Sequence, residues 1–467
     1  MTETAQTVGR AAGQDCPECG TRVTGGGAYV TWCAACDWNV DPEVRQEEAR
    51  GRVERLRRSL AHRYGEQLFA ELSGTAEASA HAGTADGAEP TNRGTGTGTG
   101  AGTGAGTGTG TVGARRGPGR DGVLAAALAV AVHGVTVALL AGGLWLLVAE
   151  WGRGLLPALG GLLIALAVVL RPRFAKLARL SGELPVLRRQ DAPRLFALLD
   201  EIAEQVGTTG LREVVIGADA NASVTTYGVR RHRVLRLGLG LWRILSPQER
   251  VAVLGHEFGH YAHGDTRRGL LVGSAFQSLA TWRYTLAPKH PDGLMDDLVN
   301  LLTAPPRLLV EGVLVLLEHL TLRDSQRAEY LADASAARAG GTVAAAGLMD
   351  RLLVSGSVEG ELGREVVAAR TRIGGARRED PAEGLWERVA AHGASIPAHE
   401  YERLRRVAER RGHQVDSTHP PTHLRHRLLT GGEEVAARIV LDPARSAGVE
   451  AELAGPALRV ARAVVRG

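Results

Sequence analysis

Residues 246–260, which read SPQERVAVLGHEFGH, are the stretch that decides the fold. Ser246 and Glu249 have the spacing of a helix capping box, and Pro247 between them suits the first helical position. These signals predict a helix that begins here and runs to about His263 and Gly264. The chemistry of the segment is therefore expected on a helix, where side chains four residues apart share a face.

His256 and His260 are four residues apart on this predicted helix, so both imidazoles project from one side and can bind the same metal ion. Glu257 lies one residue further on, beside the open coordination position of such a site. A carboxylate there can take a proton from a water that the metal activates. The segment predicts a zinc centre for hydrolysis.

A third ligand has to come from elsewhere, because the longer motif HExxHxxGxxH is absent and His263 occupies its glycine position. In the helical pattern of residues 325–333, Glu329 and Asp333 lie one turn apart on the same face. Glu329 can bind zinc, and Asp333 can orient a histidine through its distal nitrogen. Such a carboxylate pair is ordinarily a solvated face, but the upstream histidines favour the ligand interpretation.

All four cysteines lie near the N-terminus, in two CxxC pairs: Cys16 with Cys19, and Cys33 with Cys36. Two such pairs are typical of a zinc ribbon, here residues 1–40, with one structural zinc ion. The alternative is a redox-active or disulfide-bonded pair, which the presence of both pairs disfavours. The N-terminus lacks the pattern of a secretory signal, and thiolates that hold zinc must stay reduced, so a cytosolic location is expected.

Residues 41–74 are expected to form an amphipathic helix with an apolar residue every four positions. The apolar residues are Leu56, Leu60, Tyr64, Leu68 and Leu72. Residues 75–121 are rich in Gly and Thr and have too little apolar surface to offset the entropy of ordering, so they are predicted to be a disordered linker. The ribbon is then expected to range away from the rest of the chain.

Residues 122–170 are predicted to form a transmembrane helical hairpin. Val123 to Ala149 carries no formal charge and is long enough to cross the roughly 30 Å hydrocarbon layer, and Leu155 to Leu170 follows after a short turn. Basic residues flank both outer ends, which places the N-terminus and the residues after the hairpin on the cytosolic side. A buried hairpin in a soluble core is the alternative. The sequence of residues 269–322 does not decide whether this region adds further membrane passes.

Residues 171–467 are predicted to be a zincin-like metallopeptidase domain, so the fold class is α+β and mainly α. A helix is expected from Asp191 to about Gly207, and short strands at 214–216, 223–227 and 234–237 form a small sheet before the zinc-binding helix. The complete architecture is this domain joined to the membrane hairpin and the N-terminal ribbon.

Three segments together resemble the HtpX-like and CAAX-prenyl-protease-like family of integral membrane zinc metallopeptidases: residues 256–260, 329–333 and 417–422. The likeness covers about residues 181–429. It implies His256, His260 and Glu329 as zinc ligands and Glu257 as the base. It also implies that His419 and Arg425 steady the oxyanion, while His423 and His426 are interpreted as a solvated face.

Two departures from the family pattern concern the substrate and the third ligand. Asn221-Ala222-Ser223 resembles the family's Asn-Ala-Phe element on a substrate-binding edge strand, with serine in place of the aromatic residue. The family's Ser-Arg pair before the third ligand is Ser325-Gln326 here, with Arg327 displaced by one position.

The resemblance and the motifs together predict an endopeptidase of the cell membrane that cleaves proteins or peptides at the cytosolic face, with a role in membrane-protein quality control. The lipid bilayer is its expected environment. One alternative is an inactive scaffold that binds a partner through the ribbon, which the intact Glu257 disfavours. Nucleic acid is not expected as a partner, because the net charge is only +4, and Trp32 and Trp38 lie outside any dense basic stripe.

Overall fold

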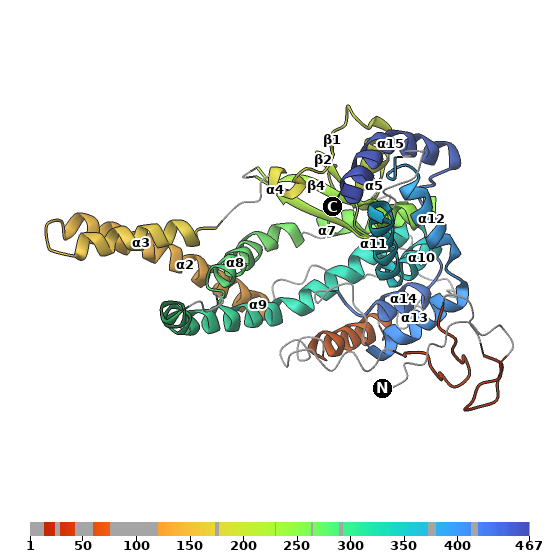
Figure 1. Cartoon of the computed structure of the whole chain (residues 1–467), viewed down its shortest axis with the longest axis horizontal. Helices are drawn as coiled ribbons and strands as arrows, with labels where there is room; N and C mark the ends of the chain where they lie inside the picture. The colour runs from red at the N-terminus through yellow and green to blue at the C-terminus, as the bar shows by residue number, and fades with distance from the viewer. Residues whose placement is uncertain are drawn as a thin grey trace, which may run out of the picture.

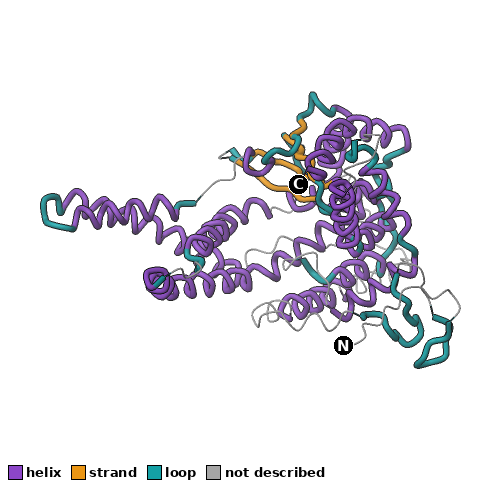
Figure 2. Tube along the Cα trace, viewed as in Figure 1, coloured by secondary structure: helices purple, strands orange, loops and turns teal. Residues whose placement is uncertain are grey.

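The computed structural model describes residues 14–23, 29–42, 59–74, 120–172, 177–228, 230–262, 265–288, 293–371, 380–411 and 419–466. It shows a stalk of long helices that projects from a broader domain containing the sheet and most of the remaining helices (Figures 1 and 2). Most of the predicted linker, residues 75–119, and residues 43–58 of the predicted amphipathic helix fall outside the described part. The remainder of that helix is formed by residues 59–74.

The stalk contains α2 (Arg120–Ala149), α3 (Leu156–Leu170), α8 (Asp265–Thr285) and the first half of α9 (Leu294–Gly340). Its small core joins α2, α8 and α9 through residues such as Ala129, Leu279 and Leu317. Outside this core its apolar side chains face outward, as Val148 does at 74% exposure. Such a surface suits lipid and argues against the alternative of a soluble buried hairpin.

Among the described residues, α2 and α9 are long and apolar enough to cross a membrane, and α3 is a shorter apolar helix. The helix pair predicted for residues 122–170 is therefore present, and α9 adds a candidate span within the region that the sequence left open. In the α2–α3 contact, Gly143 and Gly160 face each other, and a Cβ at either glycine would lie within 2.8 Å of the carbonyl oxygen of the other. The two helices depend on glycine for this approach.

Gly160→Val is expected to destabilise the hairpin, because its side chain would meet the oxygen of Gly143 and the nitrogen of Leu147. Overpacking of this kind typically costs about 1–3 kcal/mol. Thermal unfolding of the full chain in detergent micelles measures the effect. The matched control is Gly161→Val, since a Cβ at residue 161 has nothing within 4 Å. Equal stability of the two variants would contradict this packing.

The sheet has four strands in the order β1-β2-β4-β3. They are β1 (Val186–Leu187), β2 (Glu213–Gly217), β3 (Ala222–Tyr227) and β4 (His232–Gly238). β2 and β4 are parallel, and the two outer pairs are antiparallel. The three strands predicted from the sequence are confirmed, and the two-residue β1 is an addition. β3 is an edge strand, and it lies beside the helix that carries the histidine motif.

That helix is α7 (Pro247–Ala262), and it begins as predicted. The backbone N–H of Ser246 donates to Oε2 of Glu249 at 2.7 Å, and the N–H of Glu249 donates to Oγ of Ser246 at 3.3 Å, which completes the capping box. The hydroxyl of Tyr261 near its other end donates to the carbonyl of Thr225 at 2.6 Å. The helix is thus fixed to the sheet.

The other helices surround α7 and one face of the sheet (Figure 1). They are α4 (Leu177–Ser181), α5 (Pro193–Val206), α6 (Leu239–Ile244), α10 (Thr342–Leu353), α11 (Ser355–Thr371), α12 (Leu385–Ser395), α13 (Ala398–Arg411), α14 (Thr422–Thr430) and α15 (Pro443–Arg466). The main core includes Leu199 of α5 and Leu254 and Phe258 of α7, all fully buried. The prediction of a mainly helical domain with a small sheet is confirmed.

The cysteine-containing segment packs against α13, so the expectation that it ranges away from the domain is wrong. Arg406 donates to the carbonyl of Ala34 at 2.7 Å and to Oδ1 of Asp37 at 2.6 Å, and its guanidinium lies 4.9 Å from the ring centroid of Trp32. Arg403 donates to the carbonyl of Val40 at 2.8 Å. The linker composition could not indicate these contacts, because their partners are more than 360 residues away in the sequence.

Candidate metal centre

The centre is built on the close approach of α7 and α9. A Cβ at Gly255 would lie 2.9 Å from Cβ of Ala339, and one at Gly259 would lie 2.8 Å from Cα of Ala332. Larger residues at these positions would force the helices apart, and the donors on the two helices would separate. The sequence pattern of glycine on α7 and small residues on α9 is therefore what allows a shared site.

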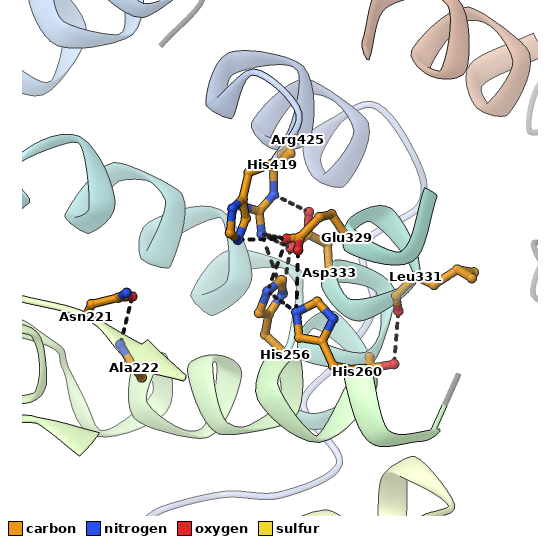
Figure 3. A network of polar contacts seen from close by, with 10 residues as sticks. Asn221, Ala222, His256, His260, Glu329, Leu331, Asp333, His419 and Arg425 are labelled. Carbon is orange, nitrogen blue, oxygen red and sulfur yellow. Dashed lines mark hydrogen bonds and ion pairs between the residues drawn. The ribbon is translucent and has the colours of Figure 1, made fainter. Parts of the chain in front are cut away.

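The two imidazoles of α7 and the Glu329 carboxylate of α9 meet at this contact (Figure 3). Nε2 of His256 and Nε2 of His260 are 3.2 Å apart. Oxygens of Glu329 lie 3.5 Å from the first nitrogen and 3.6 Å from the second. Donor atoms of the three residues all lie within 4.8 Å of one another, so they could hold one metal ion.

The residues fit a zinc ion by chemistry and by burial. Glu329 is 5% exposed, and nitrogens of His419 and His256 approach its Oε2 at 3.2 and 3.5 Å, although no described residue donates a hydrogen bond of good geometry to this oxygen. A buried carboxylate oxygen without a donor is costly unless a cation compensates it. Two imidazoles and one carboxylate with an open position are a donor set of catalytic zinc sites. A bound cation would account for this oxygen.

Asp333, one turn after Glu329, contacts the other side of His256. Its Oδ1 lies 3.0 Å from Nδ1 of this histidine, which leaves Nε2 directed toward Glu329. Burial lowers the pKa of His256, but the adjacent carboxylates of Asp333 and Glu329 outweigh burial and raise the pKa to about 10. A metal ion binds histidine at a deprotonated ring nitrogen, here Nε2, so metal binding and protonation compete at this atom.

The guanidinium of Arg425 is 1% exposed and is held by Asp333. Its Nε donates to Oδ2 at 2.8 Å and its Nη2 donates to Oδ1 at 2.6 Å. The same Nη2 lies 3.6 Å from Oε2 of Glu329. Two parallel bonds fix the plane of the carboxylate, so Arg425 acts on His256 through Asp333.

Asp333→Asn is expected to weaken metal binding by about 10- to 100-fold, the usual loss when the group that orients a ligating histidine is altered. The amide removes the charge that holds Arg425 and His256. Chelator competition on the cobalt-substituted protein measures this, because cobalt bound to thiolates and cobalt bound to imidazoles absorb differently. Asp324→Asn, an exposed carboxylate on the same helix, is the control. The same metal affinity in both variants would contradict the role of Asp333.

Glu257 lies in a cavity of about 350 Å³ that borders the metal donors and β3. It is 7% exposed, and burial raises the pKa of its carboxyl group. Nε2 of His419 lies 3.2 Å from Oε2 of Glu329 at the same cavity. The cavity is thus lined by the Glu257 carboxyl group, the candidate metal donors and the imidazole of His419.

The predicted substrate segment lines the same cavity. Asn221, Ala222 and Ser223 are at the beginning of β3, and Val224 follows them at the cavity wall. The side chain of Asn221 accepts a bond from the backbone N–H of Ala222 at 2.8 Å (Figure 3). The open side of the edge strand therefore lies next to the metal donors.

The interpretation of the histidines after His419 needs one revision. His423 was expected on a solvated face, but it is 9% exposed, and its ring lies 6.2 Å from that of His62 in an edge-on contact. His426 is half-buried. The solvated-face interpretation is wrong for His423, because the partner that covers it comes from the N-terminal helix. Ser417 and Thr418 lie outside the described residues.

Sequence reasoning missed the small residues that bring the ligands together. Gly255 and Gly259 on one helix and Ala332, Ala336 and Ala339 on the other are each three or four residues apart. Such spacing places small residues along one helix face and permits close packing. This signal was present in the sequence, but it could not identify which two helices would meet.

The four cysteines form a second group that could hold a metal ion, with donor atoms within 4.8 Å of one another. Sγ of Cys16 lies 3.6 Å from Sγ of Cys36, and Sγ of Cys19 lies 3.5 Å from Sγ of Cys33. All four are free thiols, and these separations are far beyond the roughly 2.05 Å of a disulfide. A tetrahedral thiolate site agrees with this geometry.

Two histidines from one helix and a glutamate from another define the class of site found in zinc-dependent peptidases. Residues 189–432 match the model of Peptidase family M48. This segment is more than half of the 467 residues, and the chain belongs to this family.

Several HtpX proteases are similar to the chain. A protease HtpX homolog of Pyrobaculum calidifontis is 28% identical over 244 residues, which cover 51% of this chain and 67% of the relative. Protease HtpX of Pseudomonas putida is 28% identical over 165 residues, 34% of this chain and 56% of the relative. A homolog from Thermococcus kodakarensis is 28% identical over 105 residues, 22% of this chain and 36% of the relative. The chain thus matches between about a third and two thirds of these relatives. No solved structure matches.

Proposed function

We propose that the chain is a zinc-dependent endopeptidase of the cell membrane that hydrolyses peptide bonds of proteins at the cytosolic face. The observation that carries the proposal is the meeting of His256, His260 and Glu329 beside the buried Glu257 in one cavity. The apolar stalk supports a multi-pass membrane location through α2, α3 and the first half of α9. Its substrates would include membrane proteins under quality control.

Zinc, when bound by the three ligands, makes water acidic enough to lose a proton near neutral pH and draws electron density from a carbonyl group. Glu257 takes that proton, and the raised pKa of its buried carboxyl group suits it to pass the proton to the leaving amine. His419 lines the same cavity, and we assign it as the donor to the carbonyl oxygen as negative charge develops there. Arg425 is occupied by Asp333, so we assign it a positioning role in place of contact with this oxygen.

Glu257→Gln is expected to lower cleavage of an unfolded protein by about 10²- to 10⁴-fold, because an amide of the same size cannot carry the proton. The zinc content should stay unchanged, since Glu257 is not a ligand. Purified full-length chains in detergent are compared for zinc per chain and for cleavage rate. Glu204→Gln, an exposed residue of α5, should match the wild type. Equal cleavage by the wild type and Glu257→Gln would refute the assigned base.

The substrate is proposed to bind as an extended strand on the open edge of β3. The N–H of Gly238 donates to the carbonyl of Asn221 at 3.0 Å, and Ala222 pairs with Leu237. In an antiparallel ladder this register directs the backbone groups of Ala222, Val224 and Thr226 away from β4. Because the side chain of Asn221 already binds the N–H of Ala222, the next outward N–H along the strand at the cavity wall is that of Val224.

Val224→Pro is expected to lower kcat/KM by up to about tenfold, the value of one lost hydrogen bond of about 0.5–1.5 kcal/mol. Proline removes the outward N–H without removing a bond to β4. Thr226→Pro is the control, because it makes the same change at an outward position that does not line the cavity. Steady-state cleavage of an unfolded protein by both variants is the measurement. Equal losses at the two positions would argue against strand addition beside the metal centre.

The thiolate group is proposed to hold a structural zinc ion within a ribbon that includes residues 16–36. The carbonyls of Ala34 and Val40 in this segment accept hydrogen bonds from arginines of α13. The proposed domain boundaries are those predicted from the sequence, with the ribbon and the helix of residues 59–74 docked on the peptidase domain.

A further inference from the structure

The helix of residues 59–74 lies against the part of α9 that carries Glu329. The amide Nε2 of Gln326, a residue with no exposed surface, donates to the carbonyl of Ala61 at 2.8 Å. The hydroxyl of Tyr330 lies 3.4 Å from the carbonyl of Gly65 in a buried contact. These two residues flank Glu329 on α9, so the N-terminal helix holds the helix turn from which the third ligand projects.

The same helix contacts the segment that carries His419. A Cβ at Gly65 would lie 2.7 Å from Cδ of Pro421 and 3.6 Å from a methyl group of Leu424. Only glycine allows this approach without a shift of one of the two segments. The guanidinium of Arg427 lies 4.9 Å from the ring centroid of Phe69 further along. The helix therefore packs directly on the residues that follow His419.

The buried residues of the helix of residues 59–74 are those that make these contacts. Ala61, Gly65 and Leu68 form its buried face, and Ala61 and Leu68 are 1% and 2% exposed. At the exposed edge of the contact with α9, Arg323 and Glu71 form an ion pair at 2.5 Å. A face of small and apolar residues, complementary to two other segments, is typical of permanent packing within a domain core.

We propose that the helix of residues 59–74 is a positioning element of the metal centre, which holds Glu329 and His419 in their relative places. The inference rests on the proposed function. His419 approaches Glu329 at 3.2 Å, although the two belong to different segments of the chain. The N-terminal helix touches both segments within a few residues of each group, so its displacement changes the separation of the two side chains.

Gly65→Val in the full chain tests this role, with Gly74→Val as its matched control. Both place valine on the same helix, but a Cβ at Gly74 has nothing within 4 Å. Gly65→Val is expected to lower kcat about tenfold with an unchanged KM and to release cobalt from the imidazole site to a chelator about tenfold faster. Cobalt at the thiolate site should be retained as in wild type. Gly74→Val should match the wild type in every measurement.

A folded Gly65→Val chain with the kcat and cobalt retention of Gly74→Val would overturn the proposal. Leu68→Ala provides a second test without a steric insertion, since it removes buried contact and should change kcat and cobalt release in the same direction. If Gly65→Val does not fold, this variant decides the result, and wild-type values for Leu68→Ala overturn the proposal. Glu257→Gln is measured in parallel. Full activity of Glu257→Gln would refute the proposed function. An inactive Glu257→Gln together with an unaffected Gly65→Val would refute only the positioning role of the helix.

Discussion

The structure depends on the contact between Gly255 and Gly259 of α7 and the small residues of α9. Hydrogen in place of a side chain lets the helix backbones approach until Glu329 lies within 3.6 Å of both imidazoles. The same contact brings Oδ1 of Asp333 to 3.0 Å from Nδ1 of His256. The ligand set follows from packing, because the side chains are too short to compensate for a wider helix separation.

The buried charged groups around this contact form a row in which each group contacts one of opposite charge. Arg425 binds Asp333, Asp333 binds His256, and His256 faces Glu329. Burial of any one of these ions alone would cost several kcal/mol. Removal of one member therefore leaves its neighbour buried without a group of opposite charge. The chain of contacts ends at the Glu329 carboxylate, which also faces His419 and His260. This carboxylate and the two imidazoles are the group that could hold a metal ion.

The sequence was sufficient for the local features and insufficient for the contacts between distant segments. The capping box and the three strands were accessible, because spacing within a helix or strand determines which side chains share a face. Glu329 was selected as the partner of the two histidines because the motif lacked a third ligand and because of the family resemblance. The docking of the ribbon and the burial of His423 were not accessible. Both depend on α13, α14 and the N-terminal helix meeting in space, and periodicity within one segment contains no information about its partner.

Residues 326–339 of α9 show why the sequence pattern of a helix does not reveal which segments pack on its faces. Gln326 and Tyr330 face the N-terminal helix, Asp333 faces Arg425 from α14, and Ala332, Ala336 and Ala339 face α7. The helix is covered on three sides, and only the face of Arg327, Leu331, Ala334 and Arg338 stays partly exposed, so Glu329 and Asp333 are buried. The interpretation of Glu329 and Asp333 as a solvated pair fails for this reason. Gln326, where the family resemblance led us to expect arginine, is accommodated by the carbonyl of Ala61, a neighbour from another part of the chain.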